Sequence, residues 1–225
     1  APDRDGILQG VRNDEGIDLY QTTAQFTGKN VLQVGNEQIT SPRIIIAVGT
    51  RTKVPEVPGL IDAGFHTTED FFEMSELPRS MMIFGGGYKA CELGMFLASF
   101  GCRSTIIGRN SRLLKNEEPE ISDIVLRRSR EYMNVLVNTD VTAVRVEGGE
   151  RVAVCRDRAD GSVREVRAEK ILVATGVQSN ADWLRPQNSG LAMTEDNYIV
   201  VDKYLETNVP GIFDIGDIIG RTMFR

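Results

Sequence analysis

The stretch MMIFGGGYKACELG, residues 81–94, decides the fold. Met81 to Phe84 form an apolar run typical of a buried strand, and three glycines follow at once. Beyond the glycines, apolar residues recur at the spacing of one helix face: Ala90, Leu93, Leu97 and Phe100. Gly101 then stands where a left-handed helix end is favoured. The stretch therefore predicts a strand, a tight turn and a helix.

The turn has the form G-x-G-x-x-A, which is typical of dinucleotide-binding sites. Gly85 would permit the tight turn, Gly87 would let a pyrophosphate approach the backbone, and Ala90 would let the helix lie close to the strand. The free N–H groups of the first helical turn, with the helix dipole, would face the phosphates. The alternative is a structural turn in some other α/β protein.

The composition is that of an ordinary globular protein. The chain has 225 residues, 41% hydrophobic and 26% charged, with a net charge of −6. This charge argues against nucleic acid or an anionic membrane as a partner, and no apolar run approaches the ~20 residues of a membrane span. Three cysteines without metal-ligand spacing and one histidine predict no metal site. Reduced cysteines and the lack of a secretory signal favour the cytoplasm.

The residues before the glycine turn are predicted to form strands and a connector. Residues 17–50 read as strands, and the apolar run Ile44 to Val48 suits a strand buried on both faces. In the proline-containing segment that follows, Thr67–Glu76 predicts a short helix with a threonine cap and acids near its positive end. His66 is predicted to be a surface residue.

The residues after the glycine turn alternate between strand and helix patterns. We expect a second strand, a helix starting at a proline, a third strand, a meander of hairpins and a last apolar strand, in this order: Arg103–Ile107, Pro119 onward, Val135–Val137, 141–168 and Lys170–Ala174. The strands IIIAVGT (44–50) and ILVATGV (171–177) share one form, which suggests two related α/β units, the first of them incomplete.

Four motifs together resemble the pyridine nucleotide–disulfide oxidoreductases, which include dihydrolipoamide dehydrogenase, mercuric reductase, glutathione reductase and mycothione reductase. They are AVGT before a proline-rich connector, GGGYKACELG, ATGV with Asn180, and TNVPGIFDIGDI. The resemblance implies an α/β fold. A Rossmann-like NAD(P)-binding domain, with a parallel sheet and an antiparallel β-meander, would occupy residues 53–185. It would be inserted in an incomplete FAD-binding domain, residues 1–52 and 186–225.

The resemblance also implies a central fragment of a longer parent enzyme. The sequence lacks the family's first FAD fingerprint, its redox-active cysteine pair, and its C-terminal dimerisation domain with the catalytic histidine. We therefore expect the parent to be a homodimer. The isolated chain is expected to be folded, colourless and inactive.

The resemblance assigns roles to individual residues. Asp217 would bind the FAD ribityl chain with Met223 near it, and Tyr88 would cover the nicotinamide pocket. Val141 and Gly176 would contact the dinucleotide through their backbones. Glu92 would lie beside the nicotinamide and the flavin as the catalytic candidate. Lys89, three residues before Glu92 on the helix, is hypothesised to hold it ionised.

The end of the second strand, IIGRNSRLLK (106–115), predicts the choice of dinucleotide. An NAD enzyme needs an acid here to bind the ribose 2′-hydroxyl, but no acid occurs between Gly101 and Asn116. Basic and amide residues stand here instead: Arg109, Asn110, Arg112 and Lys115. Because arginine binds a phosphate in a charge-assisted way, we expect NADP(H) over NAD(H). The alternative is a solvated basic turn.

Two functions remain open from the sequence. The first is the part of a flavoenzyme that passes hydride from NAD(P)H to FAD, which reduces a small disulfide or similar acceptor, with dihydrolipoamide as the default choice. The second is a non-catalytic dinucleotide-binding module or truncated relative. A methyltransferase with a similar glycine turn explains neither the meander nor Gly216-Asp217.

Overall fold

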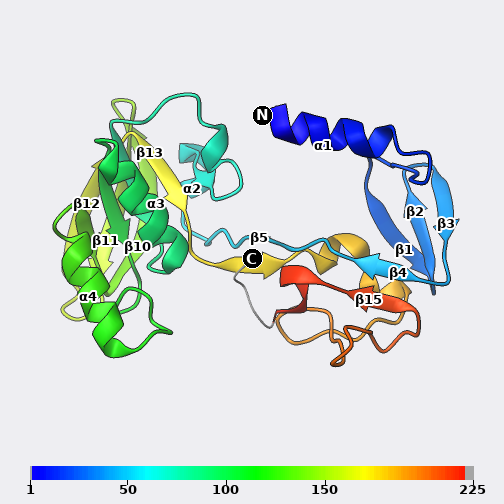
Figure 1. Ribbon diagram of the computed structural model, residues 1–225. Coiled ribbons are helices and arrows are strands. Elements are labelled where there is room, and N and C mark those ends of the chain that lie inside the picture. Colours follow the sequence, from blue (N-terminus) through cyan, green and yellow to red (C-terminus); the bar gives the residue numbers. More distant parts are fainter. Residues whose placement is uncertain (1, 221–225) are drawn as a thin grey trace. The chain divides into compact units, whose positions relative to one another are not determined.

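The computed structural model describes the backbone of residues 2–220 and the side chains of residues 6–220, in two compact units (Figure 1). The insert unit comprises residues 51–178, and the flanking unit comprises residues 2–50 and 179–220. The boundaries between the units fall after Thr50 and after Gln178, whereas the sequence predicts them after residues 52 and 185. The second differs because Ala181 and Leu184 pack into the core of the flanking unit.

A five-stranded parallel sheet forms the centre of the insert unit. Its order is β6-β13-β7-β8-β9, with these bounds: β6 His66–Thr67, β13 Lys170–Val173, β7 Ser80–Phe84, β8 Arg103–Ile107 and β9 Asn134–Leu136. With β7 as the first strand of the unit's glycine motif, this is the order of a doubly wound dinucleotide-binding sheet, although β6 precedes the others in sequence. The expected α/β class is confirmed.

Strand β7 is buried on both faces, as its unbroken apolar run predicts. Met81 and Ile83 pack in one cluster with residues of α3 (Tyr88–Ser99) and α4 (Pro119–Ser129). Met82 and Phe84 pack in the other cluster with the antiparallel meander, formed by β10 Thr139–Glu147, β11 Glu150–Asp157 and β12 Val163–Ala168. The sheet thus has helices on one face and the meander on the other (Figure 1).

The helix expected over Thr67–Glu76 is wrong. Thr67 lies in β6 instead, and only a short 3-10 turn, η1 Phe71–Glu73, follows it. The two acids accept hydrogen bonds from side chains and not from the start of a helix. Asp70 accepts from the Thr67 hydroxyl at 2.8 Å, and Glu69 accepts from the Thr52 hydroxyl at 2.7 Å. His66 is half-buried rather than on the surface, with Nδ1 3.0 Å from the Asp70 carboxylate. A four-residue helix, α2 Leu60–Ala63, precedes β6.

The flanking unit consists of short elements around a separate core. The helices and 3-10 turns are α1 Pro2–Arg12, η2 Ala181–Leu184, η3 Pro186–Asn188 and η4 Gly216–Ile219. The antiparallel strands are β1 Ala24–Gly28, β2 Val31–Val34 and β3 Glu37–Thr40, while β4 Ile44–Ile46 pairs in parallel with β15 Ile212–Asp214. Where the chain passes between the units, β5 Thr50–Thr52 pairs with β14 Val177–Ser179. No described helix has the length and apolar character to cross a membrane.

Two sequence expectations for the flanking unit are wrong. Residues 17–23 form no strand, although 17–50 read as strands throughout, and the helix α1 is not among the expected elements. The run Ile44 to Val48 is not buried on both faces, because Ile45 is 66% exposed while Ile44 and Ile46 pack into the core. An apolar run alone does not reveal whether another element covers both faces of a strand.

Asp214 ends β15 as a fully buried acid. Its side chain is 0% exposed, and neither carboxylate oxygen has a hydrogen-bond partner among the described residues. The adjacent amide of Ile215 donates to the Ile46 carbonyl at 2.9 Å, so it compensates the carboxylate little. Burial therefore raises the pKa of Asp214 from 3.8 to about 7.

This burial makes the stability of the flanking unit dependent on pH. The folded state retains a proton on Asp214 that the unfolded chain releases, so the free energy of unfolding falls as pH rises from about 4 to 7. Between pH 5 and pH 8 the free energy of unfolding of wild type should therefore fall by about 3 kcal/mol through this group, and Asp214→Asn should abolish that fall. The fluorescence of Trp183, the single tryptophan, reports urea unfolding of this unit. The exposed Asp18→Asn is the control, and a parallel pH profile for Asp214→Asn and wild type would contradict the expectation.

Candidate functional site

The glycine turn lies at the carboxyl edge of the parallel sheet, where β7 ends between β8 and β13. The Gly85 amide donates to the Ile107 carbonyl at 2.9 Å, and the Ala174 amide donates to the Phe84 carbonyl at 2.8 Å. Gly85 has a φ of +130°, and a Cβ placed on it would overlap the carbonyl oxygen of Ala174. Glycine is therefore required both by the backbone conformation and by the close approach of β13.

Gly87 leaves open space in front of helix α3. It begins the helix with a φ of −84°, is exposed, and a Cβ added there would meet no atom within 4 Å. The first helical hydrogen bond joins the Cys91 amide to the Gly87 carbonyl at 3.1 Å. The amides before Cys91 precede this first helical hydrogen bond, and helix geometry directs such amides toward the N-terminal end of the helix. An anion can approach here without a side chain in its way.

Close packing of α3 on the sheet depends on two small residues. Ala90 is fully buried, as the motif predicts. Gly94, one helical turn later, has the same role, which the motif does not predict. A Cβ on Gly94 would lie 3.1 to 3.2 Å from the side chains of Met133, Ile106 and Ile83. The four-residue spacing of Gly94 from Ala90 is the signal that would have identified it.

The basic residues after β8 lie at the same edge of the sheet. The Gly108 amide donates to the Leu136 carbonyl at 2.7 Å, which places this turn beside β9. Arg109, Asn110 and Lys115 are exposed. Arg112 Nε lies 3.8 Å from the Asp123 carboxylate, and both side chains are exposed. The structure thus brings these predicted 2′-phosphate residues to one exposed turn.

Two charged residues at this turn are not among those predicted from the sequence. Asp140, in β10, lies 3.4 Å from Arg109 Nε and 3.3 Å from Arg158 Nε. No acid occurs between Gly101 and Asn116 in sequence, but the fold brings one to Arg109. Only the folded chain reveals Asp140 and Arg158, because they are far from Arg109 along the chain.

Lys89 does not pair with Glu92. Its Nζ lies 3.4 Å from the Thr68 hydroxyl, and within residues 6–220 it forms no ion pair with the exposed Glu92. The expected pairing of Lys89 with Glu92 is therefore wrong, because the segment after β6 supplies the oxygen that Lys89 contacts. Tyr88 is half-buried at the start of α3.

Val141 and Gly176 are partly engaged by the fold itself. The Gly176 carbonyl accepts from the Lys53 amide at 2.9 Å, and Gly176 has a φ of +118°. Val141 is half-buried beside an irregularity in the pairing of β10 with β11, between Val141 and Ala143. Both residues remain candidates for backbone contacts with a dinucleotide.

Asp217 belongs to the flanking unit and not to the carboxyl edge of the insert unit. It follows Gly216, whose φ is +82°, in the turn η4. One carboxylate oxygen, Oδ1, is buried and has no hydrogen-bond partner in the described part of the chain. Met223 lies outside the described residues.

The described side chains show no metal centre or activated thiol. Among them, no group of three or more His, Cys, Asp or Glu residues is placed to hold a metal ion. The cysteines are free. Burial, followed by the charge of Glu92, raises the pKa of Cys91 to about 11, so its thiol is protonated at neutral pH.

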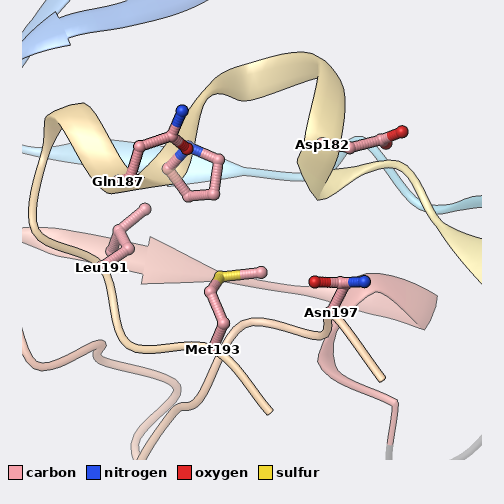
Figure 2. A pocket seen from close by; sticks show the side chains of 6 residues that line it. Asp182, Gln187, Leu191, Met193 and Asn197 are labelled. Atoms are coloured by element: carbon pink, nitrogen blue, oxygen red, sulfur yellow. The ribbon is translucent and has the colours of Figure 1, made fainter. Parts of the chain in front are cut away.

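A hollow of about 330 Å³ in the flanking unit does not involve the predicted site residues. Figure 2 shows Asp182 and Gln187 on the short helical turns, with side chains of the following loop below them. Its lining residues are Asp182, Pro186, Gln187, Leu191, Met193 and Asn197.

Similarity to known proteins identifies the family of this chain. A family model described as pyridine nucleotide-disulphide oxidoreductase matches residues 4–224. The chain belongs to this family. The family expected from the sequence is therefore confirmed.

Curated relatives and a solved structure show how much of a family member the chain represents. A mercuric reductase from Staphylococcus aureus is 29% identical over 96% of this chain and 41% of the relative. A dihydrolipoyl dehydrogenase from Mycobacterium tuberculosis is 34% identical over 87% of this chain and 43% of the relative. The HOCl-induced flavoprotein disulfide reductase RclA from Escherichia coli superposes with a TM-score of 0.88 at 28% identity, covering 98% of this chain and 50% of that one. This chain thus spans half or less of their length.

The two glycines of the turn should respond differently to the same substitution. Gly85→Ala forces a Cβ onto the Ala174 carbonyl in a strained conformation, and should lower the free energy of unfolding of the insert unit by about 2 to 4 kcal/mol. Gly87→Ala introduces a Cβ into open space and should leave this stability within about 0.5 kcal/mol. Urea unfolding followed by circular dichroism compares the two, and equal losses would contradict the assigned geometry.

Proposed function

We propose that this chain is the dinucleotide-binding part of an FAD-dependent disulfide oxidoreductase, in which it holds NADPH for hydride transfer to the flavin. The observation that carries the proposal is the position of the glycine turn. It lies at the carboxyl edge of a parallel sheet, where the strand order reverses: β8 and β9 follow on one side of β7, while β13 lies on its other side. Open α/β sheets bind nucleotides at such points.

The first turn of α3 supports binding of the pyrophosphate. Helix α3 has 12 residues, a Cβ on Gly87 at its start would meet no atom within 4 Å, and the helix dipole adds a positive potential there. In this proposal Gly85 and Ala90 fix the turn and the helix, while Gly87 admits the phosphates.

The remaining predicted residues are proposed to contact the two ends of the dinucleotide. Arg109, with Asn110 and Lys115, would bind the adenosine 2′-phosphate. The backbones of Val141 and Gly176 would contact the dinucleotide. Tyr88 and Glu92 would lie on the nicotinamide side, and Glu92 would orient the carboxamide there. The hydrogen bonds that Glu92 accepts would position the reacting ring, which acts on the rate of hydride transfer rather than on affinity.

The flanking unit offers one group that fits FAD. The buried Oδ1 of Asp217 has no partner in the described chain, so it can accept a hydrogen bond from a sugar-type hydroxyl such as those of the ribityl chain. When bound, the flavin supplies the electron-accepting ring, while the residues of this chain supply binding and orientation. Met223 is also proposed to lie near the FAD, on the basis of the sequence resemblance alone.

The proposed electron acceptor is suggested by the names of the relatives. Their names, mercuric reductase and dihydrolipoyl dehydrogenase, suggest a small disulfide or similar acceptor, with dihydrolipoamide as the default choice. A cytoplasmic homodimer is the proposed form of the parent. The alternative is a non-catalytic dinucleotide-binding module. Mass spectrometry of the protein from its source separates the two, since a parent enzyme would be about twice as long as this chain.

The choice of dinucleotide can be measured directly by calorimetric titration of NADPH and NADH. Wild type should bind NADPH more tightly, and Arg109→Ala should weaken NADPH binding about tenfold, because a charge-assisted hydrogen bond to phosphate is lost. The affinity for NADH should stay within about twofold. Arg103→Ala, which removes an exposed arginine at the opposite end of β8, is the control. Equal affinities of wild type for the two nucleotides would contradict the proposed preference.

A further inference from the structure

Backbone hydrogen bonds join three segments at the end of β8. The Asn138 amide donates to the Asn110 carbonyl at 2.7 Å, and the Thr139 amide donates to the Gly108 carbonyl at 3.0 Å. The Arg158 amide then donates to the Asn138 carbonyl at 2.8 Å. These bonds fix the backbone of Arg158 beside the turn that carries Arg109, although the two residues are distant in sequence.

The side chain of Arg158 points to the same turn. Its Nη1 donates to the Arg109 carbonyl at 3.2 Å, and its Nε lies 3.3 Å from Asp140 Oδ2. Arg109 Nε lies 3.4 Å from the other oxygen, Asp140 Oδ1. Asp140 therefore stands between two arginines, one on each carboxylate oxygen.

This arrangement contributes little to stability and remains accessible. The side chains of Arg109, Arg158 and Asp140 are 74%, 41% and 39% exposed, and ion pairs in water contribute little to folding. The trio carries two positive charges and one negative, so a net positive charge faces solvent. Because each oxygen of Asp140 is already paired, its capacity to accept a ribose 2′-hydroxyl, as an NAD enzyme requires, is reduced.

We propose that Arg158 is a second specificity-determining residue for the adenosine 2′-phosphate, and that Asp140 aligns Arg158 and Arg109 before the phosphate binds. The inference rests on the proposed function, since it concerns the same dinucleotide site. A planar guanidinium on either side of Asp140 provides donors that match phosphate oxygens. The 2′-phosphate replaces the carboxylate as the partner of the arginines, and a nucleotide without this phosphate makes no use of Arg158.

The adenosine half of the dinucleotide provides the probes for a test. Adenosine 2′,5′-diphosphate and adenosine 5′-diphosphate are titrated calorimetrically against wild type, Arg158→Gln and Arg158→Lys. Arg158→Gln should raise the dissociation constant of the 2′,5′-diphosphate about tenfold and change that of the 5′-diphosphate less than about twofold. Arg158→Lys keeps the positive charge but lacks the two parallel donors of a guanidinium. Its dissociation constant for the 2′,5′-diphosphate should lie between those of wild type and Arg158→Gln.

The matched control is Arg167→Gln. Arg167 is similarly exposed and paired with acids, but it stands on β12 opposite Val152, away from the end of β11 that precedes Arg158. It should leave both constants unchanged. An unchanged 2′,5′-diphosphate affinity in Arg158→Gln, or an equal loss for both probes, would overturn the role of Arg158 alone. If wild type bound neither probe, the proposed function would fail, and this inference with it.

Discussion

The close approach of β7 and β13 at Gly85 is the constraint on which the proposed site depends. The carbonyl of Ala174 occupies the space of a side chain at Gly85, so the chain turns sharply and α3 starts directly above the carboxyl edge of the sheet. Ala90 and Gly94 hold α3 against β7 and β8 at this height. A Cβ on Gly87, at the start of α3, would meet no atom within 4 Å. Binding of an anion here therefore needs no dedicated cationic side chain, because backbone amides and the helix dipole supply the potential.

The charge of the whole chain and the charge at the site differ in sign. The net charge is −6, but the turn after β8 presents Arg109, Arg112 and Lys115, and the fold adds Arg158. Local charge, and not the total, determines which ligand a surface attracts at a distance of one Debye length or less. Asp140 reduces this local field but also orders two long side chains, which lowers the entropy lost when a phosphate binds them.

The parts of the fold that could be predicted from the sequence are those with a local periodic signal. The strand, turn and helix of residues 81–101, and the three hairpin strands of the meander, depend on neighbours in sequence. The contacts that could not be predicted join distant segments: Asp140 to Arg109, Arg158 to the Arg109 carbonyl, and Lys89 to Thr68. Likewise, Thr67 has the character of a helix cap, but pairing of β6 with β13 overrides this local preference. Exposed Ile45 and buried Asp214 both violate their hydropathy, because burial is decided by which elements pack together.

Binding of a pyridine dinucleotide at the glycine turn of the insert unit can be tested directly. The most direct measurement is an amide nuclear magnetic resonance titration of the isotope-labelled chain with NADP⁺. We expect the largest chemical-shift changes at residues 85–90 and 108–110, with the amides of β1 to β3 in the flanking unit unchanged. Saturable shifts confined to other residues, or none at the glycine turn at saturating nucleotide, would contradict this expectation.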